Sequence, residues 1–205
     1  MSRIILIDYG MGNLNSVKRK LDRLKTDSLI TRNEKEILKA DKLIIVGVGH
    51  FAKAMKNIEN LNLIDVLNEV VLTRKKPILG ICLGMQLMAT HSEEGDCSGL
   101  NWIEAEVKRM QVSDPIQYKV PHTGWNEIIQ RKQSSLMQDI PNKAEFYFVH
   151  AYYFEAKNPD CVLNETDYAF RFTSAVEKEN IFGVQYHPEK SHEAGEMLLK
   201  NFISL

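Results

Sequence analysis

The chain has 205 residues, with 26 basic and 27 acidic side chains and a formal net charge of −1. This balance gives no electrostatic reason to expect nucleic acid or an anionic membrane as a partner, and the length fits one domain over residues 1–205. Three widely spaced cysteines exclude a disulfide framework and the paired spacing of a zinc site, so we expect no metal, no cofactor and a cytoplasmic protein. No apolar run approaches the roughly 20 residues of a membrane span, and the start does not resemble a signal peptide.

The first half alternates short apolar runs with segments of helical periodicity. Residues 4–7 predict a strand, and a helix follows with Asn13 as a suitable N-cap. Its apolar face consists of Leu14, Val17, Leu21 and Leu24. The later runs predict strands at 29–30 and 43–46 and helices at 63–72 and 85–90. Continuous apolar strands joined by helices are typical of parallel βαβ units covered on both faces.

The second half is rich in alternating and β-branched segments. The predicted strand regions are 104–110, 127–129, 145–154 and 168–185, with a hairpin turn at 177–180. A helix at 193–203 closes the chain, and His122 is assigned to a structured loop. The two halves together predict an α/β fold of three layers, with a mostly parallel central sheet, flanking helices and added antiparallel strands.

A cysteine stands where a strand passes into a helix in KKPILGICLGMQLMA, residues 75–89. Gly80 and Gly84 lie two residues to either side of Cys82, as a sharp strand-to-helix turn with close backbone approach requires. A thiol at such a turn is exposed, and the positive end of the helix dipole favours its ionised form. The same pattern also fits a tight turn whose cysteine only packs, so the rest of the chain decides between the two.

A base for that thiol is found in GVQYHPEKS, residues 183–191. His187 and Glu189 lie two apart after an apolar strand, and in extended backbone, which Pro188 favours, their side chains project to one side. A nucleophilic Cys, a His base and an orienting carboxylate form a complete triad. His150, within the apolar run FYFVHAYYF, is interpreted as a core or pocket-wall residue instead.

Acyl transfer also needs backbone N–H groups that stabilise an oxyanion. One candidate is the amide of Leu83, directly after Cys82, and the other is VGVGHF, residues 46–51, after a predicted strand. Glycines at 47 and 49 allow this loop to come close, although they also fit an ordinary strand-to-helix turn.

At this point the chain resembles a known family. GICLGMQ around Cys82 together with HPE at 187–189 is similar to the signature of class I glutamine amidotransferases, which have a flavodoxin-like fold. Further matches extend the likeness over nearly the whole chain. They resemble the glutaminase subunits of imidazole glycerol phosphate synthase and comprise IDYGMGNLNSV, GVG at 47–49, SEEG at 92–95, PHTGWN at 121–126 and YFVHAYY at 147–153.

The resemblance implies a role for each matching residue. Cys82 is the nucleophile, His187 the general base and acid, and Glu189 its orienting group. The oxyanion set is Val48, Gly49 and Leu83, in a segment where a peptide flip can be needed. The residues expected to contact the substrate, L-glutamine, are Gly47, Gln86, Glu94, Ala151 and Tyr152. Trp125 and Asn126 match the contact with the synthase partner.

The resemblance also implies a partner: a cyclase subunit with a (β/α)8-barrel fold, in an obligate heterodimer. Glutamine hydrolysis would feed ammonia to that subunit, which makes imidazole glycerol phosphate and AICAR in histidine biosynthesis. Two positions depart from the family: Val46 stands where proline is usual, and Ala151 where serine is usual. Val46 is expected to alter the flip, whereas backbone contacts should preserve glutamine binding at Ala151.

Three other functions remain open. The first is that of a paralogue in surface-polysaccharide biosynthesis, which supplies ammonia through a cyclase-like barrel to a sugar amidotransferase. The chain is similar to such paralogues in VGHFAKAM, LNWIEAEVKRM and HPEKSHEAG. A stand-alone cysteine hydrolase would act without a partner on larger γ-glutamyl or peptide substrates. A non-enzymatic module with a redox-sensing Cys82 would leave His187 and Glu189 without a role.

Overall fold

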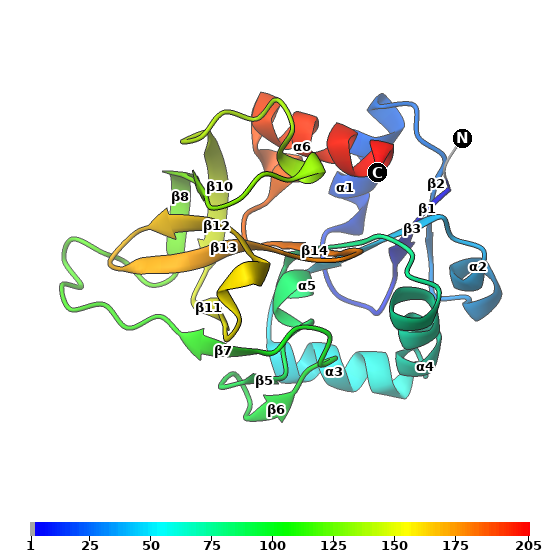
Figure 1. Cartoon of the computed structure of the whole chain (residues 1–205). Helices are drawn as coiled ribbons and strands as arrows, with labels where there is room; N and C mark the ends of the chain where they lie inside the picture. The colour runs from blue at the N-terminus through cyan, green and yellow to red at the C-terminus, as the bar shows by residue number, and fades with distance from the viewer. Residues whose placement is uncertain (1–2) are drawn as a thin grey trace.

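A parallel sheet of buried strands forms the centre of the protein (Figure 1). The computed structural model describes residues 3–205. Its parallel strands lie in the order β2-β1-β3-β4-β14. Their bounds are Ser28–Thr31 for β2, Ile4–Ile7 for β1, Lys42–Gly47 for β3, Ile78–Cys82 for β4 and Ile181–Val184 for β14. Four of the five are buried along their whole length, which explains their uninterrupted apolar sequences.

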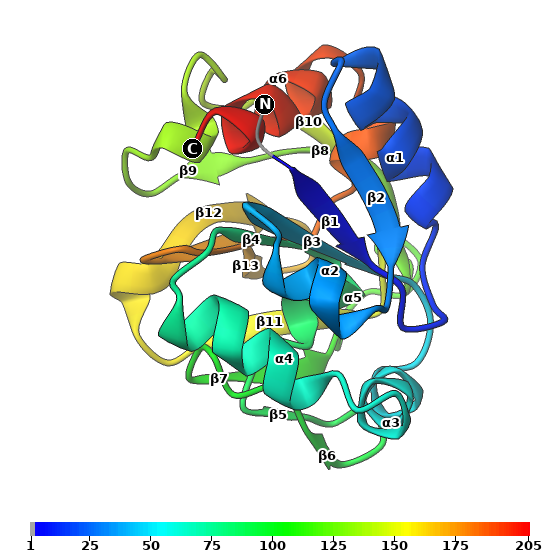
Figure 2. The ribbon, with the colours of Figure 1, turned by 90° about the vertical axis from the view of Figure 1, so that its right-hand side faces the viewer.

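Helices cover both faces of this sheet, as predicted (Figure 2). One face packs against α1 (Leu14–Arg23) and α6 (His192–Ser204). The other packs against α2 (Glu34–Leu38), α3 (Phe51–Asn60), α4 (Ile64–Asn68) and the π-helical turn η1 (Glu69–Thr73). The Asn13 side chain accepts a hydrogen bond from the Ser16 amide, which confirms the predicted N-cap of α1.

The sheet is extended beyond β14 by further strands. These are β13 (Arg171–Lys178), β11 (Tyr152–Ala156), β7 (Ala105–Arg109), β5 (His91–Ser92) and β6 (Cys97–Ser98). They pair antiparallel with one another, except that β5 runs parallel to β7. β12 (Val162–Asp167) pairs with β13 and with β9 (Ile129–Gln130). A separate two-stranded sheet joins β8 (His122–Glu127) to β10 (Glu145–His150). The described part of the chain also contains the short 3-10 turns η2 (Ser135–Met137), η3 (Pro159–Cys161) and η4 (Pro188–Lys190).

Residues 145–156 serve two sheets in succession. Among residues 3–205, β10 pairs with β8 alone, and after Ala151 the chain continues as β11 in the main sheet. The predicted single strand region 145–154 is therefore two strands with a change of direction at Ala151.

Two predicted elements are wrong. The helix predicted at 85–90 is α5 (Leu83–Gln86), which ends early because the carbonyls of Leu87, Met88 and Ala89 accept hydrogen bonds from residues 100–103. His122 and Trp125 lie in strand β8 and not in a loop. The predictions also missed β12, whose polar residues Asn164 and Thr166 bond other side chains in the interior.

No helix within residues 3–205 has the length and apolar character needed to cross a membrane.

The turn at the end of β4 depends on two glycines. A Cβ on Gly84 would lie 1.9 Å from the carbonyl oxygen of Ile45, and one on Gly80 would lie 2.6 Å from that of Gly84. Both distances are shorter than any real Cβ contact, and each involves main chain that cannot rotate away. The predicted need for close backbone approach on both sides of Cys82 is therefore confirmed.

We expect Gly84→Ala to lower the free energy of unfolding by at least about 3 kcal/mol, because β3 must shift to admit the methyl group. Gly124→Ala is the matched control: Gly124 also has a positive φ, of 137°, but nothing lies within 4 Å of a Cβ there, so it should cost only about 1 kcal/mol. Urea titrations of both variants measure the difference. Equal losses would contradict the packing argument.

Candidate active site

Cys82 ends strand β4 and stands at the start of α5 in a strained conformation. Its φ of 56° and ψ of −113° are unusual for a residue with a Cβ. The Sγ atom lies 3.9 Å from the carbonyl oxygen of Val149, which its S–H can approach as a donor. Because α5 has a single turn, its dipole is smaller than that of a full helix. The strain follows the pattern of a nucleophile held at the apex of a strand-to-helix turn.

His187 and Glu189 form a buried pair beside β10. Nδ1 of His187 lies 2.8 Å from Oε1 of Glu189, and both side chains are 1% exposed. The pairing is confirmed, but the extended geometry predicted for it is wrong, because Pro188–Lys190 form the turn η4, which presents the carboxylate to the ring. Since a carboxylate only accepts, Nδ1 carries the proton and Nε2 is free to accept one.

The charge state of His187 depends on both neighbours. Burial lowers its pKa, but interactions with Cys82 and Glu189 raise it further than burial lowers it, to about 9. No hydrogen bond joins Nε2 to another side chain within residues 3–205. At neutral pH the His187 ring therefore carries protons on both nitrogens, as a cation between the Cys82 side chain and the Glu189 carboxylate.

A cavity of about 330 Å³ opens over Cys82, and we call it the Cys82 cavity. It is lined by Val48, Gly49, Cys82, Leu83, Gln86, Glu94, Pro121, Val149, His150, Ala151 and Tyr152. Nine of these eleven residues were singled out from the sequence, eight as site residues and His150 as a pocket-wall candidate, and the eleven come from five separate segments of the chain. His187 and Glu189 are buried and do not line the cavity.

The segment predicted to stabilise an oxyanion forms one rim of the Cys82 cavity. Val48 and Gly49 are exposed there, and Gly49 has a φ of 109°. Gly47 does not line the cavity: a Cβ there would lie 2.3 Å from the hydroxyl of Tyr9. That hydroxyl donates to the carbonyl of Val46 at 2.9 Å, so the start of the segment is fixed. The predicted glutamine contact of Gly47 stays a prediction.

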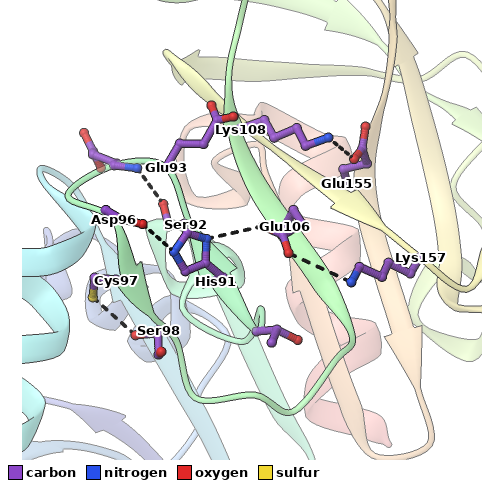
Figure 3. Close-up of polar contacts among 12 residues, drawn as sticks. His91, Ser92, Glu93, Asp96, Cys97, Ser98, Glu106, Lys108, Glu155 and Lys157 are labelled. Carbon is purple, nitrogen blue, oxygen red and sulfur yellow. Dashed lines mark hydrogen bonds and ion pairs between the residues drawn. The ribbon is translucent and has the colours of Figure 1, made fainter.

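Glu94 reaches the Cys82 cavity from a loop that is attached to β7. Figure 3 shows His91 between Asp96 and Glu106: Nε2 lies 3.0 Å from Asp96 Oδ1 and Nδ1 lies 3.3 Å from Glu106 Oε2. Glu94 Oε2 accepts a hydrogen bond of 2.7 Å from the backbone amide of Phe51. The carboxylate therefore connects the loop to the start of α3, next to the rim.

A chain of hydrogen bonds leads from β8 to the cavity wall. Asn126 Nδ2 lies 3.4 Å from His122 Nε2, and His122 Nδ1 lies 3.1 Å from His150 Nε2. His150 Nδ1 lies 2.8 Å from the carbonyl oxygen of Tyr152. Since that carbonyl only accepts, one set of tautomers satisfies the chain, with both rings neutral and each donating through Nδ1. Burial lowers the pKa of His122 to about 4 and, with the His122 ring, that of His150 to about 3.

Trp125 and Asn126, predicted as partner contacts, do not line the Cys82 cavity. The Trp125 side chain is 44% exposed and its ring stacks on His192 at 4.8 Å between centroids. Asn126 donates to the carbonyl of Asp167 at 2.8 Å. An exposed tryptophan supported from below is a suitable anchor for another protein.

Sequence reasoning missed the polar residues around the thiol. Gln185 Nε2 lies 3.6 Å from Cys82 Sγ, and the Tyr9 hydroxyl lies below the oxyanion segment. Burial raises the pKa of Tyr9, and the nearby Cys82 raises it further. The signal for Gln185 was present: it is a polar residue directly after the apolar strand β14 and two residues before His187.

Among residues 3–205, no group of three or more His, Cys, Asp and Glu side chains is arranged to hold a metal ion.

Comparison with known proteins identifies the family. The class-I glutamine amidotransferase model matches residues 5–205. The chain is 47% identical to imidazole glycerol phosphate synthase subunit HisH 1 of Campylobacter jejuni (strain RM1221), over 98% of this chain and 100% of that protein. It is 42% identical to subunit HisH 2 of Pseudomonas aeruginosa, over 98% of this chain and 99% of that protein. The chain therefore belongs to the class I glutamine amidotransferase family.

Solved structures agree on the fold. The crystal structure of a putative GMP synthase protein of Thermoplasma acidophilum superposes with a TM-score of 0.73 at 19% identity, covering 100% of this chain and 93% of that one. A structure described as a glutamine amidotransferase gives 0.74 at 16% identity, covering 98% and 97%. The α/β architecture predicted from the sequence is confirmed.

The neutral histidine pair should make the protein sensitive to acid. A folded-state pKa of about 3 at His150 lies below the unfolded value of about 6.5, so the unfolded chain binds the proton more tightly and stability falls as pH drops from 6.5. Uptake of one proton on unfolding changes the free energy of unfolding by about 1.4 kcal/mol per pH unit, so the protein loses about 3 kcal/mol of stability between pH 6.5 and pH 4. We expect His150→Gln to flatten this slope.

Urea titrations between pH 7 and pH 4 measure the slope for wild type and variant. His50→Gln, at an exposed position, is the matched control and should keep the wild-type slope. The variant's stability at pH 7 does not enter the comparison, which uses the change with pH alone. Parallel curves for wild type and His150→Gln would refute the assignment.

Proposed function

We propose that this chain is the glutaminase subunit of an imidazole glycerol phosphate synthase. It hydrolyses L-glutamine to glutamate and ammonia and passes the ammonia to a cyclase subunit, which makes imidazole glycerol phosphate and AICAR in histidine biosynthesis. The observation that carries the proposal is the strained Cys82, which lines a cavity and interacts with His187, the ring that pairs with Glu189. The family match and relatives named as subunits of that synthase, aligned over nearly their whole length, support it.

The first half-reaction joins the glutamyl group to the enzyme. The Cys82 thiolate attacks the carboxamide carbon, and the backbone amides of Leu83 and of the 48–49 segment hold the oxyanion. When the tetrahedral intermediate collapses, the C–N bond breaks and the imidazolium of His187 gives its proton to the leaving ammonia. A pKa of about 9 suits His187 to this donation at neutral pH. Glu189 keeps the ring in the tautomer that works through Nε2.

The second half-reaction releases glutamate. His187, now neutral, takes a proton from water, and the hydroxide attacks the γ-glutamyl thioester. The C–S bond breaks and Cys82 is restored as the thiolate with a protonated His187 beside it. In the proposal the substrate is held by Gln86, Glu94, Ala151 and Tyr152, which line the Cys82 cavity, and by Gly47 at the start of the oxyanion segment.

The partner receives the ammonia directly, since free ammonia is largely protonated near neutral pH and loses its nucleophilicity. The proposed partner is a (β/α)8-barrel cyclase in an obligate heterodimer, docked over the exposed Trp125 and the neighbouring Asn126. We place the complex in the cytoplasm and treat residues 1–205 as one glutaminase domain. Ordering of the 47–49 segment by the partner switches the site on, and Val46 in place of proline affects that step.

We expect glutamate release to depend on Cys82 and on the partner. Purified chain is assayed with glutamine alone and with a cyclase subunit plus its nucleotide substrate. Cys82→Ala should abolish release, while Cys161→Ala, which removes a buried thiol that does not line the cavity, should leave it unchanged. Strong stimulation by the cyclase supports the histidine pathway. No binding and no stimulation would reject that pathway and direct the search to a sugar amidotransferase system.

We expect Glu189→Gln to lower kcat about 10²-fold, because the amide removes the negative charge that stabilises the imidazolium of His187. Without the carboxylate the pKa of His187 falls below about 9, so the pH profile of kcat also moves. Glu193→Gln, an exposed position at the start of α6, is the control and should change neither quantity. Indistinguishable profiles for Glu189→Gln and wild type would contradict the role of Glu189.

A further inference from the structure

Gln185 is a buried amide that the proposed reaction does not use. It follows the last residue of β14, lies two residues before His187 and is 0% exposed. Its backbone amide donates to the carbonyl of Ser174 at 2.8 Å, so its main chain is fixed by β13. Burying an amide is unfavourable unless its polar atoms are paired, so the partners of this side chain indicate its purpose.

The orientation of the Gln185 amide follows from one backbone carbonyl. The oxygen of Tyr152 can only accept, so the Gln86 atom 3.0 Å from it is Nε2. Gln86 Nε2 is also 2.9 Å from the Gln185 side chain, and the atom it meets must therefore be the acceptor Oε1. The remaining end of Gln185, its Nε2, then lies 3.6 Å from Cys82 Sγ. The Gln185 N–H group therefore faces the sulfur because the Tyr152 carbonyl orients Gln86, and Gln86 in turn orients Gln185.

The polar neighbours of Cys82 Sγ include the Val149 carbonyl, which stabilises the thiol, and the Gln185 amide, which stabilises the thiolate. The carbonyl of Val149 accepts from the thiol S–H at 3.9 Å and offers nothing to a thiolate. The Gln185 N–H is a donor, and hydrogen bonds strengthen when the acceptor is ionised. When the thiol loses its proton, the first contact is lost and the second becomes stronger.

We propose that Gln185 is a further catalytic residue, whose side-chain N–H stabilises the Cys82 thiolate. The proposal rests on the proposed function, in which that thiolate attacks glutamine. Gln86 and the carbonyl of Tyr152 hold the donor in place. The competing explanation is that Gln185 serves only to hold Gln86 in the wall of the cavity, in which case its removal affects glutamine binding and not the sulfur.

Alkylation of Cys82 by iodoacetamide separates these explanations, because the reaction needs no bound glutamine. The thiolate forms a C–S bond and iodide leaves, so the rate follows the ionised fraction of the sulfur. The rate at Cys82 is measured by peptide mass spectrometry between pH 5 and pH 10, for the wild-type chain and for Gln185→Met. Methionine has a similar volume and removes the donor.

We expect the midpoint of the alkylation profile to move up by about one pH unit in Gln185→Met. Below the midpoint, this shift corresponds to an alkylation rate that is about tenfold lower than in wild type. The plateau rate at high pH should be kept, which shows that access to the sulfur is unchanged. Partner-stimulated kcat should fall by a similar factor, with KM for glutamine less affected. A midpoint that coincides with that of wild type would overturn the proposal.

Thr166→Val controls for general damage to the interior. Thr166 donates to Ser174 at 2.9 Å, both residues are buried, and neither contacts the sulfur. This variant should lower the free energy of unfolding and leave the alkylation midpoint unchanged. An equal shift in Thr166→Val and Gln185→Met would mean that the midpoint reports loosened packing, which would also overturn the proposal.

A measurement on the wild-type chain covers the case in which Gln185→Met does not fold. The side-chain amide resonance of Gln185, in 15N-labelled protein, should shift with pH at the alkylation midpoint of Cys82, and Cys82→Ser should remove that shift. An amide resonance that does not respond would reject the proposal. If glutamate release proves independent of Cys82, the proposed function fails, whereas Cys82-dependent release with an unmoved midpoint rejects the role of Gln185 alone.

Discussion

The conformation of Cys82 is the constraint on which the rest of the site depends. A residue with a Cβ is held at a φ of 56° only because β4 is fixed between β3 and β14 and because α5 starts at once behind it. That arrangement brings the main chain of Gly84 against the carbonyl of Ile45, closer than any side chain would allow. Buried parallel strands thus supply the rigidity, and the strain is stored at the one position that presents a thiol to the cavity.

Most of the fold and the site was readable from the sequence, for identifiable reasons. The central strands are fully buried, so their apolar runs are unbroken, and HPE carries its pairing within three residues. The failures have two causes. β8 and β12 carry His122, Asn164 and Thr166 inward, where other side chains satisfy them, so the alternation that marks a strand is hidden. Helix α5 ends early because residues 100–103 donate hydrogen bonds to the carbonyls of residues 87–89, which follow it.

The polar interior near the thiol is ordered by backbone groups that cannot reorient. The carbonyl of Tyr152 receives both the His150 ring and the Gln86 amide, and through them it fixes the tautomers of two histidines and the direction of a second glutamine. Local sequence gives no sign of such an arrangement, since its members are up to 99 residues apart, as Gln86 and Gln185 are. Buried networks of this kind specify a unique arrangement only when every member is satisfied.

The change of sheet at Ala151 has a mechanical consequence. The chain passes from the small β8–β10 sheet into the main sheet within one residue, and that residue lines the Cys82 cavity. A tilt of the small sheet relative to the main one cannot be absorbed by a flexible loop, because residues 145–156 contain none. The torsion must be taken up by the main chain of the cavity wall itself, so a lateral force on the ring of Trp125 would be transmitted along β8 and β10 into the wall of the cavity.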